Sequence, residues 1–224
     1  MLYKWLRKQI LSTNKGTIAY KMRAKRMSEY LAFYKCKVIS ELGEDIRRVQ
    51  ILDIGGAERF WVSADSYFRD SADITMLNLE SDQARENSEH FFSVVGDATD
   101  LSAYADGELD LVFSNSVIEH VGSWENKVKM ANEMCRVGKH IYLQTPNKLF
   151  PIEPHFTLLF IQFLPRKIQA QIVSFKEKIS YERAYEKVCD VNLLTYKDMK
   201  KLFPKTKIHR ERFCGLTKSF VVYY

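Results

Sequence analysis

The sequence lacks several patterns that would assign it at once. Its 224 residues include four cysteines without a C-x-x-C pair and five histidines without H-x-x-x-H spacing, so neither a disulfide framework nor a metal site is expected. It has no Walker, G-x-S-x-G or G-x-G-x-x-G sequence. No apolar run reaches membrane-spanning length, and the N-terminal residues are too polar for a signal peptide. These absences predict a cytoplasmic protein with reduced thiols.

Acidic residues are missing from the first 26 positions, where basic residues gather, and a second basic cluster lies between Lys201 and Arg212. The formal net charge is +6. Such surfaces are most often solvated helix faces, but they also suit anionic partners such as a phospholipid membrane. The aromatic residues among the N-terminal basic ones are spaced as in a helix core, so nucleic acid is not expected as a partner.

Short apolar segments alternate with helical patterns along the chain. This alternation predicts an α/β fold, a Rossmann-like doubly wound sheet of about seven strands, mostly parallel and ending in a C-terminal antiparallel hairpin. The predicted strands are Val49–Ile54, Asp73–Leu79, Phe91–Val95, Leu109–Ser114, His140–Gln144, Lys207–Phe213 and Ser219–Tyr223. The predicted helices are Thr17–Leu42, Trp61–Phe68, Trp124–Val137 (with Val128, Ala131, Met134 and Cys135 inward) and Leu194–Leu202.

The most informative stretch is Val49–Trp61, which reads V-Q-I-L-D-I-G-G-A-E-R-F-W. A β-branched run ends in Asp53, breaks at Gly55 and Gly56, and continues as a helix. The glycines let backbone approach a ligand where a Cβ would clash, and the helix start offers free N–H groups. This order predicts a nucleotide-sized pocket at the end of the first strand. Asp53 could instead stabilise the turn itself.

Polar groups also follow the next three predicted strands. They are Asn78 and Glu80, then Gly96-Asp97-Ala98, then Ser114-Asn115-Ser116-Val117-Ile118-Glu119-His120-Val121. Because the carboxyl ends of parallel strands meet at one edge of a sheet, these groups should line one cleft. Glu80 and Asp97 would also suit the N-caps of following helices.

In this order the elements resemble the class I S-adenosylmethionine-dependent methyltransferases, nearest the small bacterial type 11 or type 12 branch. The resemblance covers Val49 to Asn147 and, weakly, Glu211–Phe220. It implies S-adenosyl-L-methionine as the cofactor. It further implies a cofactor site made of Asp53, Gly55, Gly56 and Ala57 (amino-acid portion), Asn78 or Glu80 (ribose, with the carboxylate favoured), Asp97 and Ala98 (adenine), and Ser114 and Asn115. Ala57 and Arg59 stand where the family usually has glycines.

His120 is the candidate general base, with Glu119 beside it, because a neutral imidazole can take a proton from a hydroxyl during methyl transfer. Equally, this pair could only orient its loop through hydrogen bonds. Asn147 and His155 are candidate acceptor-binding residues. The predicted reaction is O-methylation of a small molecule, a sugar or a lipid-linked acceptor. The alternatives are a non-catalytic binding subunit of the same fold, which Ala57 and Arg59 favour, and a nicotinamide-dependent oxidoreductase.

No linker or repeat divides the chain, so one domain is expected. Its parts are a helical basic segment (1–45), a cofactor-binding core (46–147), a lid and acceptor-site insertion (148–203) and a terminal hairpin (204–224). The stretch Pro151–Val173 within the lid is strongly apolar. It either packs against the rest of the domain or, together with the basic N-terminus, rests on an anionic membrane surface.

Overall fold

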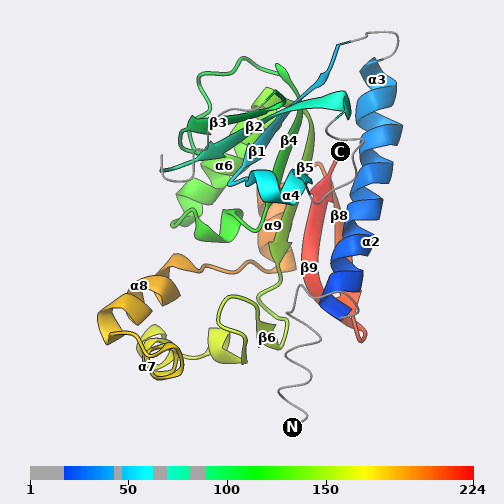
Figure 1. The fold of residues 1–224 in the computed structure, drawn as a ribbon. Helices are drawn as coiled ribbons and strands as arrows, with labels where there is room; N and C mark the ends of the chain where they lie inside the picture. Colours follow the sequence, from blue (N-terminus) through cyan, green and yellow to red (C-terminus); the bar gives the residue numbers. More distant parts are fainter. Residues whose placement is uncertain (1–17, 43–46, 63–69, 81–88) are drawn as a thin grey trace.

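The computed structural model describes residues 18–42, 47–62, 70–80 and 89–224. Seven strands form one sheet in the order β3-β2-β1-β4-β5-β9-β8 (Figure 1). The first five run parallel, whereas β9 is antiparallel to both β5 and β8. The strands are β1 (Val49–Ile54), β2 (Ala72–Asn78), β3 (Phe91–Val95), β4 (Leu109–Asn115), β5 (Gly138–Pro146), β8 (Lys207–Phe213) and β9 (Leu216–Tyr223). The predicted fold class is confirmed.

Successive strand residues point to opposite faces of the sheet, and in this fold both faces are covered by other elements. Leu52 and Val112 face a core completed by α6 (Trp124–Val137) and α9 (Tyr196–Leu202). Ile51 and Leu111 face a second core. This core is covered by α2 (Ile18–Phe33), the π-helical turn η1 (Tyr34–Ile39) and α4 (Glu58–Val62). A short helix, α3 (Ser40–Leu42), continues from η1. The result is a three-layer sandwich with the strand ends free at one edge.

Local capping explains where the helices of the first core begin. Ser123 precedes α6, and its side chain accepts a hydrogen bond from the Asn126 amide. Thr195 and Asp198 form a reciprocal capping box at the start of α9. Each pairing satisfies backbone donors that the first helical turn leaves without partners.

The lid follows β5 and has its own small core. It comprises the short strands β6 (Ile152–Glu153) and β7 (Leu158–Leu159), the 3-10 turn η4 (Ile161–Phe163), α7 (Arg166–Glu177) and α8 (Tyr181–Asp190). Phe156, Ile161 and Val173 are buried in this core with residues of α8. Figure 1 shows α7 and α8 packed together beside the main sheet. The lid is therefore a helical subassembly rather than a simple loop.

Two sequence predictions of local structure are corrected, and one helix was not predicted. Cys135 is exposed on α6 instead of pointing inward. The helix expected over Trp61–Phe68 begins earlier, at Glu58, and residues 63–69 lie outside the described part. Helix α8 was not predicted, and only two of its residues, Ala184 and Val188, are buried.

Candidate functional site

The turn after β1 is built so closely that only glycine fits. A Cβ at Gly56 would lie 2.1 Å from Oδ2 of Asp53, and one at Gly55 would lie 2.4 Å from Cγ2 of Val117. Gly55 also has a φ of +70°, which L-residues with side chains rarely adopt. The turn therefore leaves its backbone bare and packs directly against the loop after β4.

Asp53 lies beneath this turn and is buried, with an exposed fraction of 2%. The indole Nε1 of Trp61, on α4, donates to its Oδ2 at 2.6 Å. Burial raises the pKa of Asp53 to about 7, against the smaller lowering effect of the Trp61 hydrogen bond. Because burial disfavours the ionised form of this carboxyl, a cation that binds next to it would stabilise that form strongly. Ala57, next in the turn, keeps a negative φ, so an alanine is tolerated there.

The ends of β2 and β3 present the expected polar groups. Asn78 is buried and its amide donates to the Gly56 carbonyl at 3.1 Å, so it braces the glycine turn. Glu80 and Asp97 are exposed at the same edge. Asp97 accepts a hydrogen bond from the Thr99 amide at 2.8 Å. The side chain of Ala98 packs in the first core, which leaves only its backbone for a ligand.

Ser114 and Asn115 end β4 on the other side of the turn. Ser114 is fully buried, and its Oγ has no hydrogen-bond partner within the described structure. Oδ1 of Asn115 receives a long hydrogen bond, 3.5 Å, from Arg26 of α2. Ser116 adopts a φ of +61° and is held by Gln144 of β5 through its amide and its hydroxyl. Ser114 and Asn115, like the polar groups after β2 and β3, thus stand at the carboxyl ends of the parallel strands, at one edge of the sheet.

These features fit a nucleoside-bearing amino acid. The glycine turn is a cradle that any Cβ would fill, a buried carboxyl lies beneath it, and exposed carboxylates stand at the next two strand ends. Residues 52–141 match the family model described as a methyltransferase domain. Over these residues the chain carries an S-adenosylmethionine-dependent methyltransferase domain of the type 11 branch. No curated protein matches the sequence.

Solved structures resemble the methyltransferase at the level of the fold. An O-methyltransferase family protein from Burkholderia thailandensis shares 11% identity over 90% of this chain and 58% of that one, with a TM-score of 0.50. A protein from Rhodobacter sphaeroides described as a zinc-dependent alcohol dehydrogenase shares 10% identity over 81% and 86%, also at 0.50. A methyltransferase from Methanosarcina mazei shares 13% identity over 84% and 95%, at 0.49.

Three side chains from distant segments of the chain also meet in the described structure. Glu119 and His120 lie on the 3-10 turn η3 (Ile118–His120) after β4, and His155 lies in the lid between β6 and β7. One ligand atom from each lies within 4.8 Å of the others. We call these three residues the histidine cluster. The sequence predicted His120 and Glu119 as catalytic and His155 as acceptor-binding, and the fold brings all three together.

Carboxylates hold both imidazoles of the histidine cluster. Nδ1 of His120 lies 2.6 Å from Oδ2 of Asp190, at the end of α8. Nδ1 of His155 lies 2.6 Å from Oε1 of Glu153. Burial acts to lower the pKa of His155, but the hydrogen bond and charge of Glu153 outweigh it and the pKa is raised. Sequence reasoning missed Asp190 and Glu153, because no local spacing links them to the histidines.

Glu119 is fully buried within the histidine cluster. Its Oε2 accepts a hydrogen bond from Thr145 at 2.9 Å, and its backbone carbonyl accepts one from the Asn192 amide at 2.8 Å. Burial raises the pKa of its carboxyl, although Thr145 and both histidines favour the charged form. Glu119 thus ties η3 to β5 and to the segment after α8, as the loop-orienting interpretation expected.

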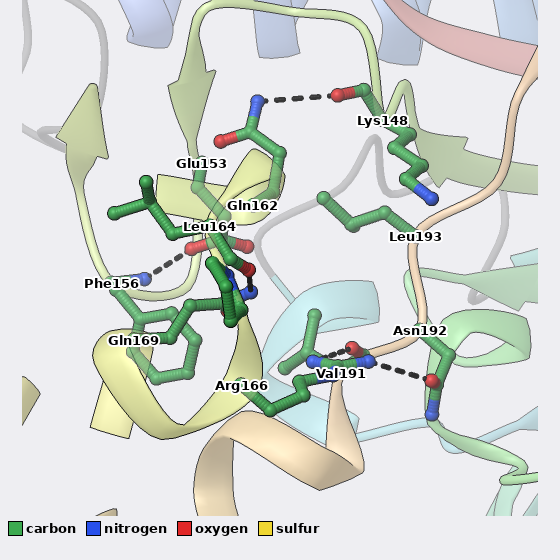
Figure 2. Close-up of a pocket in the computed structure, with 11 residues that line it drawn as sticks. Lys148, Glu153, Phe156, Gln162, Leu164, Arg166, Gln169, Val191, Asn192 and Leu193 are labelled. Carbon is green, nitrogen blue, oxygen red and sulfur yellow. Dashed lines mark hydrogen bonds between the residues drawn. The ribbon is translucent and has the colours of Figure 1, made fainter. Parts of the chain in front are cut away.

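Two cavities are lined in part by lid residues, and none of the three residues of the histidine cluster lines either of them. One, of about 310 Å³, lies between the lid and residues 191–193 (Figure 2). Glu153 forms part of its wall with Oε2 accepting from the Phe156 amide, and Arg166 bridges across to the Val191 carbonyl at 3.0 Å and to Asn192 at 2.8 Å. These contacts fasten the lid to the chain that returns to α9.

The second cavity, of about 370 Å³, is lined by Asn115 and Ser116 at the end of β4, and we call it the acceptor chamber. Arg26 and Lys218 also line it. Arg26 forms a bidentate ion pair with Glu211 of β8, at 2.6 and 2.8 Å. The remaining lining residues are Gln144, Pro146, Asn147, Phe150, Ile152, Pro154, Thr157 and Ser219.

Asn147, the other predicted acceptor residue, lines the acceptor chamber but is already engaged. Its amide donates to the Thr217 carbonyl at 2.8 Å, and its Oδ1 accepts from the Leu149 amide at 3.1 Å. It joins β5 to β9 at the chamber wall. Arg26, 185 residues from Glu211 in sequence, was missed as a site residue because nothing local indicates their pairing.

Proposed function

We propose that this methyltransferase methylates an oxygen atom of its acceptor, at the histidine cluster. When bound, S-adenosylmethionine supplies a methyl group on a positively charged sulfur, activated for in-line displacement. Aligning the acceptor is then most of the catalytic task. A hydroxyl acceptor must also lose its proton, and imidazoles are the side chains that exchange protons near neutral pH. The observation that carries the proposal is the pair of carboxylate-aligned imidazoles beside the cofactor turn.

The position of the histidine cluster supports this assignment. Val117 packs against Gly55 of the cofactor turn, and Glu119 and His120 follow within three residues. The side chains of His120 and His155 are 29% and 24% exposed, so an acceptor can reach them. The lid supplies His155, so acceptor binding and lid position are coupled.

The acceptor chamber favours a hydroxyl-rich acceptor that carries negative charge. Arg26 and Lys218 bring two cationic groups to the chamber, against the single carboxylate of Glu211. Backbone-anchored Asn147 adds polar character to the wall. A sugar linked through phosphate to a nucleotide or a lipid has this chemistry.

Methyl transfer to oxygen can be tested with methyl-tritiated S-adenosylmethionine and three acceptor classes: free sugars, nucleotide-linked sugars and polyprenyl-phosphate-linked sugars. We expect label in a base-stable ether, formed by wild type and by His209→Ala, an exposed histidine outside the site, and reduced at least 100-fold in His155→Ala. Label that mild base releases as a methyl ester, or label on nitrogen, sulfur or carbon, would contradict the proposal.

The lid surface supports docking on an anionic membrane, where a lipid-linked acceptor would lie. Ile168, Ile172 and Phe175 recur at helical spacing on α7 and are 43%, 36% and 89% exposed. Phe160 and Phe163 of the same lid are about half exposed. The sequence of α7, R-K-I-Q-A-Q-I-V-S-F-K-E, contains three basic residues and one acidic residue. No described helix is long and apolar enough to cross a bilayer.

Vesicle flotation tests this docking. We expect wild type to float with vesicles of anionic phospholipid and less with neutral ones, since apolar insertion and charge attraction add. Phe175→Glu should weaken flotation, whereas Leu216→Glu, at a 52% exposed position on the C-terminal hairpin, should not. Equal flotation of wild type and Phe175→Glu would refute the lid as the docking surface.

A further inference from the structure

The two imidazoles of the histidine cluster face each other in an unusual way. Nε2 of His120 lies 3.1 Å from Nε2 of His155. The opposite nitrogen of each ring, Nδ1, lies against a carboxylate, which in its ionised form only accepts hydrogen bonds. Each Nδ1 must therefore carry hydrogen. In two neutral rings, the lone pairs on Nε2 then point at each other, and such contact is unfavourable unless a cation or a proton lies between them.

A buried carboxylate oxygen completes the arrangement. Oε1 of Glu119 is buried and has no hydrogen-bond partner within the described structure, while Oε2 is occupied by Thr145. Oε1 lies 3.9 Å from Nε2 of His155. A buried, unpaired carboxylate oxygen is costly, so its retention beside two converging nitrogens calls for a positive ligand.

We propose that Glu119, His120 and His155 bind a divalent transition metal ion, of which Zn²⁺ is the best match. Two imidazoles and one carboxylate are a common zinc ligand set, with a coordination position left for solvent or substrate. If both Nε2 atoms bound one zinc ion at about 2.05 Å, their separation of 3.1 Å would correspond to an N–Zn–N angle of about 98°. Oε1 of Glu119 lies 3.9 Å from Nε2 of His155, and one ligand atom of each residue lies within 4.8 Å of the others, so Glu119 would need to move toward both imidazoles to reach a tetrahedral arrangement.

The surroundings are those of an established type of metal site. Metal-bound histidines generally donate their second ring nitrogen to a carboxylate, which fixes the tautomer and strengthens the ligand. Asp190 and Glu153 do this for His120 and His155 respectively. The partial exposure of both imidazoles gives an ion access from solvent. Sequence spacing did not reveal the site because its ligands come from η3 and the lid, 35 residues apart.

The metal site would also give the ion a role in the proposed methyl transfer to oxygen. Only this role, and not metal binding itself, rests on the proposed function. An ion held by these residues would keep an open coordination position that could bind the acceptor hydroxyl. Coordination lowers the pKa of a bound hydroxyl. His120 would then be a metal ligand instead of a proton acceptor, while methyl transfer to oxygen would remain the reaction.

The test measures metal directly and needs no acceptor. Purified full-length protein is titrated with Zn²⁺ by competition with a chromophoric chelator, and with Co²⁺ by visible absorption. We expect one ion per wild-type chain, with affinity reduced at least 100-fold in His120→Ala and in His155→Ala. Asp190→Asn should lose about 10- to 100-fold, because it removes only the outer carboxylate. His209→Ala, which removes an exposed histidine elsewhere, should bind as wild type does.

The readout also separates this site from the exposed cysteines. A Co²⁺ spectrum without thiolate charge-transfer bands is expected, and circular dichroism checks that each variant is folded. Binding that is equal in wild type and in the folded His120→Ala and His155→Ala variants would overturn the proposal. An absence of metal binding by wild type would also overturn the proposal. In that case a shared proton would account for the contact between the two imidazoles. A metal-loaded protein without activity on any hydroxyl acceptor would refute the proposed reaction alone.

Discussion

Asp53 offers the most direct test of how the cofactor turn is built, through Asp53→Asn. Burial raises the pKa of its carboxyl from 3.8 to about 7. The folded chain therefore holds this proton more tightly than the unfolded chain does. It follows that the free energy of unfolding falls as the pH rises from about 4 through 7. Asparagine has the same shape and does not titrate, so the variant should not show this fall.

The magnitude follows from the two pKa values. A difference of about three pH units, at about 1.36 kcal/mol each, costs the wild type about 4 kcal/mol once the carboxyl is fully ionised. Between about pH 5 and about pH 8 the loss is about 2.6 kcal/mol. The extra amide hydrogens of asparagine cost about 1–3 kcal/mol at every pH. The change with pH is therefore the quantity to compare.

Urea unfolding of the cofactor-free protein, followed by tryptophan fluorescence, measures this change, since Trp61 contacts the carboxyl directly. We expect Asp53→Asn to gain about 2–3 kcal/mol on wild type between about pH 5 and about pH 8. Asp110→Asn is the matched control, because Asp110 is also buried but its pKa is about 2, below this range. A constant difference between Asp53→Asn and wild type would show that the buried carboxyl is not held neutral.

The same substitution tests the role that the family resemblance implies for Asp53. If the carboxylate binds the cofactor's ammonium group, Asp53→Asn should bind S-adenosylhomocysteine at least tenfold more weakly by calorimetry. Wild-type affinity should rise as the pH increases toward about 7, because binding requires the ionised carboxyl. Unchanged affinity in the variant would remove Asp53 from the cofactor site.

Three further substitutions test other parts of the structure. Burial acts to raise the pKa of Asp110, but hydrogen bonds from Arg47, the Gln50 amide and Lys139 hold it at about 2. Asp110→Asn should therefore lower the free energy of unfolding by about 1–2 kcal/mol at neutral pH. Its cost should fade on acidification toward about pH 2 in unfolding experiments; a pH-independent cost would contradict this. Gly56→Ala should weaken calorimetric binding of S-adenosylhomocysteine at least tenfold, because its Cβ would overlap Asp53; wild-type affinity would show that the turn can move. Arg26→Ala should cost about 2–3 kcal/mol in urea unfolding by leaving Glu211 without its ion pair, and adding Glu211→Gln should restore part of it; an additive double variant would refute the coupling.

The central fold was predictable because its signals are local. The run V-Q-I-L-D-I forms β1 over the predicted residues, and β3, β8 and α6 also match their predicted bounds. Each has an apolar pattern that one layer of the fold satisfies. The antiparallel end of the sheet followed from two β-like segments separated by Gly215, whose φ is +79°.

The acceptor side was less predictable because its contacts are long-range. The histidine cluster joins residues 35 apart in sequence, and the Asp190 contact to His120 spans 70. The apolar content of the lid was equally ambiguous. Phe156 enters the lid core, whereas Phe175, in the same segment, is 89% exposed. Periodicity identifies an apolar face but not whether a core or another surface covers it.

The lid and the chemistry of the site depend on the same few contacts. The lid contributes His155 to the histidine cluster, and α8 contributes Asp190. Asn192, immediately after α8, donates its amide to the Glu119 carbonyl. A displacement of the lid would therefore separate the two imidazoles and free His120 from its carboxylate. Because the lid carries both the exposed apolar stripe of α7 and these contacts, we expect a surface that binds the stripe also to stabilise the geometry of the histidine cluster.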